Sequence, residues 1–212
     1  MFYAAMLLVG TVTGFLPVLP MMALYHLVML KKDRALHTKT PAPHIVVVYV
    51  FCYALSCVLS VTSVPGIPYM AFDPIVNFIP FTGILTNFLQ FLLNVLLFVP
   101  IGFLLPLLWK RFEKPQLTLL CGFLLSLSIE LLQLFNNRIT DIDDLLMNTA
   151  GSILGYLLFV LAKKIFPKIS KLSIGSANHW KWEPCFCFGF VWISMLLIQP
   201  VVASWILTPI IM

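Results

Sequence analysis

The sequence predicts an all-α, polytopic transmembrane helix bundle of about six spans, with both termini outside. Hydrophobic residues make up 61% of the 212 residues and charged residues only 10%, whereas a soluble domain averages about 25% charged residues. Six apolar segments each reach the roughly 20 residues that a helix needs to cross a bilayer. Basic residues gather in alternate loops, as the positive-inside rule describes. Lipid must therefore cover much of the apolar surface, because one water-facing globule could not hide it.

The six predicted spans are apolar runs separated by short polar loops. They cover about residues 2–30, 45–64, 83–108, 117–135, 144–162 and 185–207. The first span contains Pro17 and Pro20, so we expect a kink or break there. The third contains Pro100 and Pro106, with a similar consequence expected. The first run lacks the features of a cleaved secretory signal, so we expect it to be retained as a span.

The distribution of charge predicts the orientation. Every lysine and arginine except Arg138 lies in one of three loops, which follow the first, third and fifth spans. These are Lys31, Lys32, Arg34 and Lys39, then Lys110, Arg111 and Lys114, then Lys163, Lys164, Lys168, Lys171 and Lys181. The positive-inside rule assigns these loops to the cytoplasm. We therefore attribute the net charge of +5 to the orientation of the spans in the membrane. No nucleic-acid partner is expected.

The predicted organisation has three parts. Residues 1–44 form the first span and a basic cytoplasmic loop, residues 45–165 form a central transmembrane domain, and residues 166–212 form a second basic loop and the last span. The cysteines and histidines show no metal-ligand spacing. We therefore expect neither a metal site nor a cofactor, and we interpret the cysteines as packing residues.

Acidic residues collect near the predicted outer ends of the spans. They are Asp73, Asp141, Asp143 and Asp144, with Glu130 inside the fourth apolar run. An ionisable group inside a bilayer costs about 2.5–3.5 kcal/mol on insertion scales. Ser126, Glu130 and Gln133 share one helix face by their i, i+4, i+7 spacing. That face is either a hydrogen-bonded patch between helices or a ligand or proton site.

The segment after Glu130 continues the polar pattern. If the fifth helix begins near Thr140, one face carries Asp141, Asp144, Asn148, Gly151 and Gly155. Thr140 or Asp141 can cap the helix, and Asp143 is expected to point elsewhere, toward the outer headgroups. The glycines permit close helix contact, and the expected partner is the helix that carries Glu130.

A third polar stripe follows the third span. It consists of Gly83, Asn87, Gln90 and Asn94. Polar faces of this kind should turn toward one another, because lipid cannot satisfy them. Arg138 either pairs with Glu130, Asp141 or Asp144, or clamps a phosphate or carboxylate of a ligand.

Four motifs in order resemble the VanZ-like family of bacterial membrane proteins, named for a teicoplanin-resistance accessory protein. They are NFIPF at 77–81, NVLLFVPIG at 94–102, SIELLQ at 128–133, and RITDIDD at 138–144 followed by Asn148, Thr149 and Gly151. The resemblance covers about residues 45–165. It implies a multi-pass protein of the bacterial cytoplasmic membrane, and some members of the family lower susceptibility to lipophilic glycopeptides.

The expected function is binding at the outer membrane face. The ligand would be a lipid-linked envelope precursor or a lipophilic glycopeptide, and its binding would lower antibiotic susceptibility. Membrane lipids are the other expected partner. The candidate ligand-binding residues are Asn77, Asn94, Glu130, Gln133, Arg138, Asp141, Asp144 and Asn148, and the candidate helix-packing residues are Gly102, Gly151 and Gly155.

Two other functions stay open. In an intramembrane enzyme acting on a lipid or cell-wall precursor, Glu130 and Asp144 would supply an acid and a base, and Arg138 would stabilise a phosphate or an oxyanion. Against this, Ser128 and Thr149 have no nearby basic partner, and the spacing of the acids is not diagnostic of a divalent ion. A proton-coupled transporter would use Glu130 as a relay, but the sequence shows no inverted repeat.

Overall fold

Six helical segments in the described part of the chain are long and apolar enough to cross a membrane, which confirms the predicted helix bundle. They are Leu7–Ala35, Ala42–Val61, Phe88–Leu108, Pro115–Gln133, Ile142–Ile165 and Trp180–Trp205. The structure is a computed structural model, which describes residues 2–38, 40–64, 66–72, 74–81, 88–136, 139–173 and 179–211.

Contacts between residues divide the chain into two compact units. Unit one comprises residues 1–70 and 182–212, and unit two comprises residues 71–181. The first and last spans therefore belong to the same unit.

Unit one is built from α1 (Phe2–Phe15), α2 (Val18–Ala35), α3 (Ala42–Val61), α7 (Glu183–Ile193) and α8 (Gln199–Ile211). The π-helical segment Ser194–Ile198 joins α7 to α8, and a short 3-10 turn, η1 (Ile67–Tyr69), follows α3. Cys52 of α3 and Cys187 of α7 are buried, as expected of packing cysteines, whereas Cys185 is exposed.

The expected break in the first span is confirmed. The helix α1 ends at Phe15, and α2 begins at Val18 directly after Pro17. Pro20 lies in the first turn of α2, where a missing backbone N–H needs no helical partner. Pro17 thus separates α1 from α2, and Pro20 is accommodated at the start of α2.

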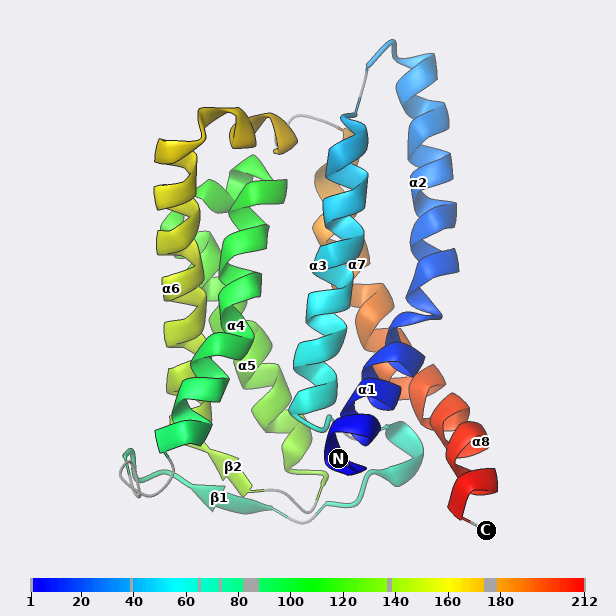
Figure 1. Cartoon of the computed structure of the whole chain (residues 1–212), viewed down its shortest axis with the longest axis vertical. Helices are drawn as coiled ribbons and strands as arrows, with labels where there is room; N and C mark the ends of the chain where they lie inside the picture. Colours follow the sequence, from blue (N-terminus) through cyan, green and yellow to red (C-terminus); the bar gives the residue numbers. More distant parts are fainter. Residues whose placement is uncertain are drawn as a thin grey trace. The chain divides into compact units, whose positions relative to one another are not determined.

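Unit two is built from α4 (Phe88–Leu108), α5 (Pro115–Gln133) and α6 (Ile142–Ile165), which lie side by side (Figure 1). The 3-10 turn η2 (Lys110–Glu113) joins α4 to α5. No break occurs at Pro100 or Pro106, because α4 runs through both prolines, and the alternative of a kink stays a prediction. Proline is tolerated inside a transmembrane helix where neighbouring helices pack against it.

A short parallel strand pair, which the sequence analysis did not anticipate, closes one end of unit two. Strand β1 (Ile75–Asn77) pairs with β2 (Ile139–Asp141), with Asn77 opposite Asp141. The pair lies where α5 ends and α6 begins, at the bottom of the view in Figure 1. The 3-10 segments η2 and η3 (Pro167–Leu172) lie at the other end of the three helices (Figure 1), and η4 (His179–Trp182) precedes α7.

The glycine face of α6 packs against α4, so the expectation that it meets the helix carrying Glu130 is wrong. A Cβ atom added to Gly151 would lie 2.2 Å from the carbonyl oxygen of Val95. One added to Gly155 would lie 2.2 Å from that of Val99. Only glycine allows the two backbones to approach this closely. The face is used by α4 because α5 meets a different side of α6.

Two further glycines complete the three-helix contact. A Cβ atom at Gly102 of α4 would lie 2.1 Å from the carbonyl oxygen of Ser152 in α6. One at Gly122 of α5 would lie 2.2 Å from the hydroxyl oxygen of Ser152. Gly102, Gly151 and Gly155 therefore occupy the tight contact between α4 and α6.

Candidate functional site

The polar face of α5 is turned into the protein, as its spacing predicts. Ser126, Glu130 and Gln133 are all buried, and Glu130 is only 4% exposed. The face therefore does not look into lipid, where its hydrogen-bonding groups would go unsatisfied.

Asp141 ends β2 and caps α6. Its carboxylate accepts hydrogen bonds from the backbone N–H of Asp143 at 3.0 Å and from the Asn77 side-chain amide at 3.3 Å to each oxygen. The predicted cap is thus confirmed for Asp141. Because α6 begins at Ile142, Asp141 does not share a helical face with Asp144, and that expectation is wrong.

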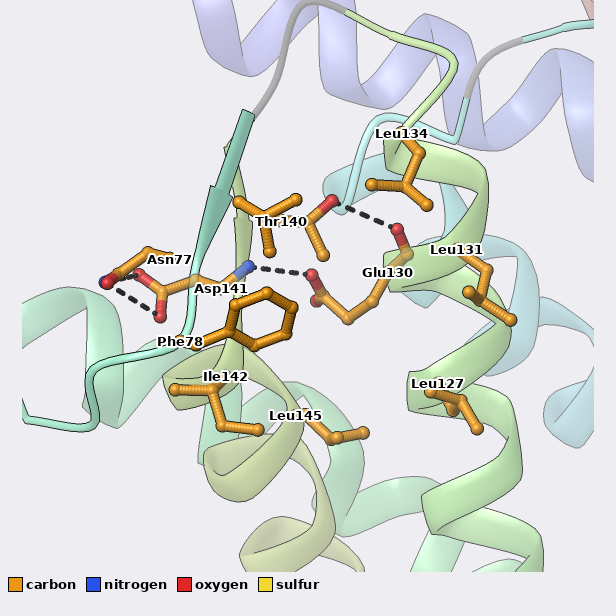
Figure 2. Close-up of a pocket in the computed structure, with 11 residues that line it drawn as sticks. Asn77, Phe78, Leu127, Glu130, Leu131, Leu134, Thr140, Asp141, Ile142 and Leu145 are labelled. Carbon is orange, nitrogen blue, oxygen red and sulfur yellow. Dashed lines mark hydrogen bonds between the residues drawn. The ribbon is translucent and has the colours of Figure 1, made fainter. Parts of the chain in front are cut away.

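Glu130 binds the backbone of β2. Its Oε2 atom accepts a hydrogen bond from the backbone N–H of Asp141 at 3.1 Å, and the Thr140 hydroxyl donates to the Glu130 carbonyl at 3.2 Å (Figure 2). These two bonds join the end of α5 to the strand pair. Hydrogen bonds to a charged acceptor are among the stronger ones in proteins.

Asp143 is buried and holds the loop after β1. It is 2% exposed, and its two carboxylate oxygens lie 2.8 and 3.0 Å from the backbone nitrogen of Phe81, which donates to them. The expectation that it points toward outer headgroups is therefore wrong. The cause is tertiary: residues 77–81 reach the first turn of α6, where an amide of the loop needs an acceptor.

Asp144 and Asn148 contact different neighbouring helices. The Asn94 side-chain amide of α4 donates to Asp144 at 2.6 Å. The Asn148 side-chain amide donates to the hydroxyl of Ser126 in α5 at 3.0 Å, in a buried position. Polar residues from α4, α5 and α6 thus do meet, in pairs distributed around α6.

One residue of the expected third stripe, Gln90, is exposed and does not join this arrangement. Arg138, Asp73, Gly83 and Asn87 lie outside the described residues. Of the expected stripe on the third span, the described part of the chain brings only Asn94 to the site.

The two hydroxyl groups considered as nucleophiles donate hydrogen bonds to backbone carbonyls of their own helices. Ser128 donates to the carbonyl of Leu125 at 2.6 Å, and Thr149 donates to the carbonyl of Leu145 at 2.7 Å. Neither bond involves a base that would activate the hydroxyl. Among the described residues, no group of three or more His, Cys, Asp or Glu side chains is arranged to hold a metal ion.

An apolar pocket of about 210 Å³ lies beside Glu130. Figure 2 shows Phe78 and side chains from the start of α6 on one side of it and leucines of α5 on the other. Its surface is almost entirely apolar, because the polar side chains in its wall are engaged in the hydrogen bonds above. It is lined by Val76, Asn77, Phe78, Leu127, Glu130, Leu131, Leu134, Thr140, Asp141, Ile142 and Leu145.

The apolar residues that line the pocket were not among the site residues predicted from the sequence. Phe78 is 77% exposed yet lines the pocket, and it lies inside the NFIPF motif. That motif was the available signal. The leucines gave none, because apolar residues are common throughout a membrane protein and do not stand out.

Comparison with known proteins gives one family. The VanZ/LLP1 family model matches residues 44–163. Protein VanZ of Enterococcus faecium is 37% identical over 90 residues, which are 42% of this chain and 54% of that protein. The chain thus matches about half the length of this curated relative. No solved structure matches the chain.

Proposed function

The chain belongs to the VanZ/LLP1 family, and from this premise we propose that it binds the hydrocarbon chain of a lipid-linked envelope precursor or of a lipophilic glycopeptide, and thereby lowers antibiotic susceptibility. It is a multi-pass protein of the bacterial cytoplasmic membrane. The observation that carries the proposal is the apolar pocket beside Glu130.

The chemistry of the pocket favours a hydrocarbon ligand. Leucines of α5 face Phe78 and Leu145 across a space with almost no polar surface. Each methylene group buried in such a space contributes about 0.8 kcal/mol. Asn77, Glu130, Thr140 and Asp141 also line the pocket, and their side chains carry the polar groups proposed to contact a headgroup.

The charge distribution favours the outer face. Within unit two, Lys110 and Arg111 lie between α4 and α5, and Lys163 and Lys164 lie in the last turn of α6. The Glu130 pocket lies at the opposite end of α5 and α6. If the basic end is cytoplasmic by the positive-inside rule, the pocket faces the outer leaflet, where envelope precursors are used and glycopeptides arrive.

A matched pair of substitutions tests the proposal. Leu131 and Leu124 lie two turns apart on the same face of α5 and are 53% and 51% exposed, but only Leu131 lines the pocket. We expect Leu131→Trp to fill the pocket and to abolish protection against an acylated glycopeptide in a susceptible host. Leu124→Trp should leave protection intact at equal expression. Equal protection by the two variants would contradict the proposal.

A crosslinking experiment on the purified protein tests lipid binding directly, without relying on antibiotic protection in cells. A lipid with a photoactivatable diazirine in its chain should crosslink within residues 127–145 of the purified protein, and Leu131→Trp should lower the yield. Three of the candidate residues from the sequence, Arg138, Glu130 and Asp144, are tested separately by replacing all three with alanine. Full protection by that triple variant would exclude them as the effector.

A further inference from the structure

Unit one contains a buried cluster of one carboxylate and two imidazoles, outside the pocket. Glu183, the first residue of α7, is 0% exposed. Its Oε1 atom lies 3.1 Å from Nε2 of His26 in α2, and its Oε2 atom lies 2.7 Å from Nε2 of His44 in α3. The histidines look scattered in the sequence, but two of the four meet here. We call His26, His44 and Glu183 the Glu183 cluster.

The Glu183 cluster lies inside membrane-spanning segments. His26, His44 and Glu183 each fall within a different candidate span. All three are close in sequence to basic residues, since Lys31 follows His26, Lys39 precedes His44 and Lys181 precedes Glu183. The positive-inside rule places this end of the spans at the cytoplasmic side. A net charge on these side chains would be costly, because all three are almost fully buried within membrane-spanning segments.

The contacts between the Glu183 carboxylate and the two Nε2 atoms indicate how many protons the three groups must carry to have no net charge. A carboxylate accepts from both imidazoles only if each Nε2 carries a hydrogen. With both rings neutral, the three groups then bear one net negative charge. One added proton, on either ring or on the carboxyl group, makes them neutral. Because the three groups are in contact, that proton belongs to the cluster as a whole.

We propose that the Glu183 cluster is a proton-binding site that holds α2, α3 and α7 together when it carries this one added proton. Loss of the proton leaves an uncompensated buried charge, which weakens the junction. A second added proton, with both rings charged, would give the cluster a net positive charge. The cluster with one added proton is therefore the stable state.

The other titratable groups around the cluster do not replace it. Tyr25 and Tyr49 place their rings 5.7 and 5.3 Å from the His26 ring. Cys52 and Cys187 are buried in the facing helices, and Cys185 is exposed. Phenols and thiols ordinarily keep their protons at neutral pH.

Of the other charged residues of α2, Lys31, Lys32 and Arg34 are exposed, and the buried Asp33 is engaged locally. The Asp33 carboxylate accepts hydrogen bonds from the hydroxyls of Thr38 and Thr40 at 2.6 and 2.7 Å. The helix α1 and the π-helical segment, which also pack in unit one, have no acidic or basic side chain. The cluster is therefore the proton-binding group of this junction among the described residues.

The sign of the pH dependence follows from proton linkage. Above pH of about 6.5, the ordinary pKa of histidine, the separated and hydrated groups carry almost no added proton, so the proposed single-proton cluster holds one proton more than they do. Stability therefore falls as pH rises wherever the folded state binds more protons than the unfolded state. One linked proton raises the unfolding equilibrium constant about tenfold per pH unit.

The test is the unfolding equilibrium of the purified full chain in nanodiscs, measured from about pH 7 to about pH 9, where unfolded histidines and carboxylates carry almost no added proton. Glu183→Gln keeps a hydrogen-bond acceptor and a donor for the two rings but removes the charge, so we expect its pH slope to be flat. His37→Asn is the control, because it removes an exposed histidine and asparagine tolerates the positive φ of 53° at that position. It should keep the slope of the wild type. Equal slopes for Glu183→Gln and wild type would overturn the proposal.

A second measurement leaves the cluster intact and stands even if Glu183→Gln does not fold. In two otherwise cysteine-free proteins, the labelling rate of buried Cys187 is compared with that of exposed Cys185. Below about pH 8, where thiols are mostly protonated, the thiolate fraction of each rises by the same factor with pH, so the ratio removes this common effect. We expect the Cys187 to Cys185 ratio to rise with pH as the junction loosens. A constant ratio would overturn the proposal.

Discussion

Glu130 and Glu183 are both buried carboxylates at the ends of membrane spans, yet they are stabilised in different ways. Glu130, in unit two, accepts a hydrogen bond from the backbone of β2 and lies beside an apolar pocket. Glu183, in unit one, accepts from two imidazoles and lies at the junction of three helices. An amide is a neutral donor, whereas an imidazole can also carry a proton. The first arrangement lies beside the pocket proposed to bind a ligand, and the second joins three helices through imidazoles.

The two units also differ in how their helices approach. In unit two, α4 and α6 are in backbone contact through Gly102, Gly151 and Gly155. In α7 of unit one, a Cβ atom added to Gly189 would meet nothing within 4 Å. A glycine is thus required where the backbones of α4 and α6 meet and is dispensable at position 189, whereas a Cβ atom at Gly14 of α1 would lie 2.1 Å from the side-chain sulfur of Met195.

The sharpest test of the comparison is to remove each carboxylate. Glu183→Ala leaves two buried imidazoles without their acceptor, and breaking a buried pair in this way costs about 3–5 kcal/mol. Glu130→Ala removes the acceptor of one amide, for about 1–3 kcal/mol. Thermal unfolding in the same detergent measures both. A larger loss for Glu130→Ala would reverse the assignment of roles.

The next largest effect concerns the glycines. Gly155→Ala places a methyl group 2.2 Å from the Val99 carbonyl, so we expect a loss of about 3 kcal/mol or more through overpacking. Gly189→Ala, the matched control, should be neutral or stabilising by about 0.5–1 kcal/mol, because it lowers the entropy of the unfolded chain. The unfolding midpoints of the two variants should therefore move in opposite directions or differ clearly.

A smaller and local effect is expected at the loop that Asp143 holds. Asp143→Ala removes the acceptor of the Phe81 amide, a hydrogen bond to a charged group that is worth about 1.5–3 kcal/mol. Asp143→Asn keeps one acceptor oxygen and should lose less. Hydrogen exchange at Phe81 reports the opening directly. Unchanged exchange in the alanine variant would show that the loop is held by other contacts.

The smallest effect on stability is expected at Phe78. Because this side chain is largely exposed, Phe78→Ala should change the free energy of unfolding by less than about 0.5 kcal/mol. It should nevertheless lower the yield of lipid crosslinking, since Phe78 lines the pocket. Ile79→Ala, at an exposed neighbouring residue outside the pocket, is the control. Equal crosslinking by the two variants would remove Phe78 from the site.

Much of the architecture was predictable from local sequence. The six spans and the break at Pro17 follow from apolar length and from the missing N–H of proline, which act within one segment. The shared face of Ser126, Glu130 and Gln133 follows from helical periodicity. The motifs pointed to the family that the comparisons show.

Local sequence is enough to predict which segments enter the membrane and which helix faces are polar, because hydropathy and periodicity are properties of neighbouring residues. The partners of the polar and small residues depend on tertiary packing. The glycines of α6 meet α4 and not α5, Asp143 turns inward to the loop at Phe81, and His26 and His44 converge on Glu183. These pairings depend on how distant segments pack, and every buried donor and acceptor must find its partner within that packing.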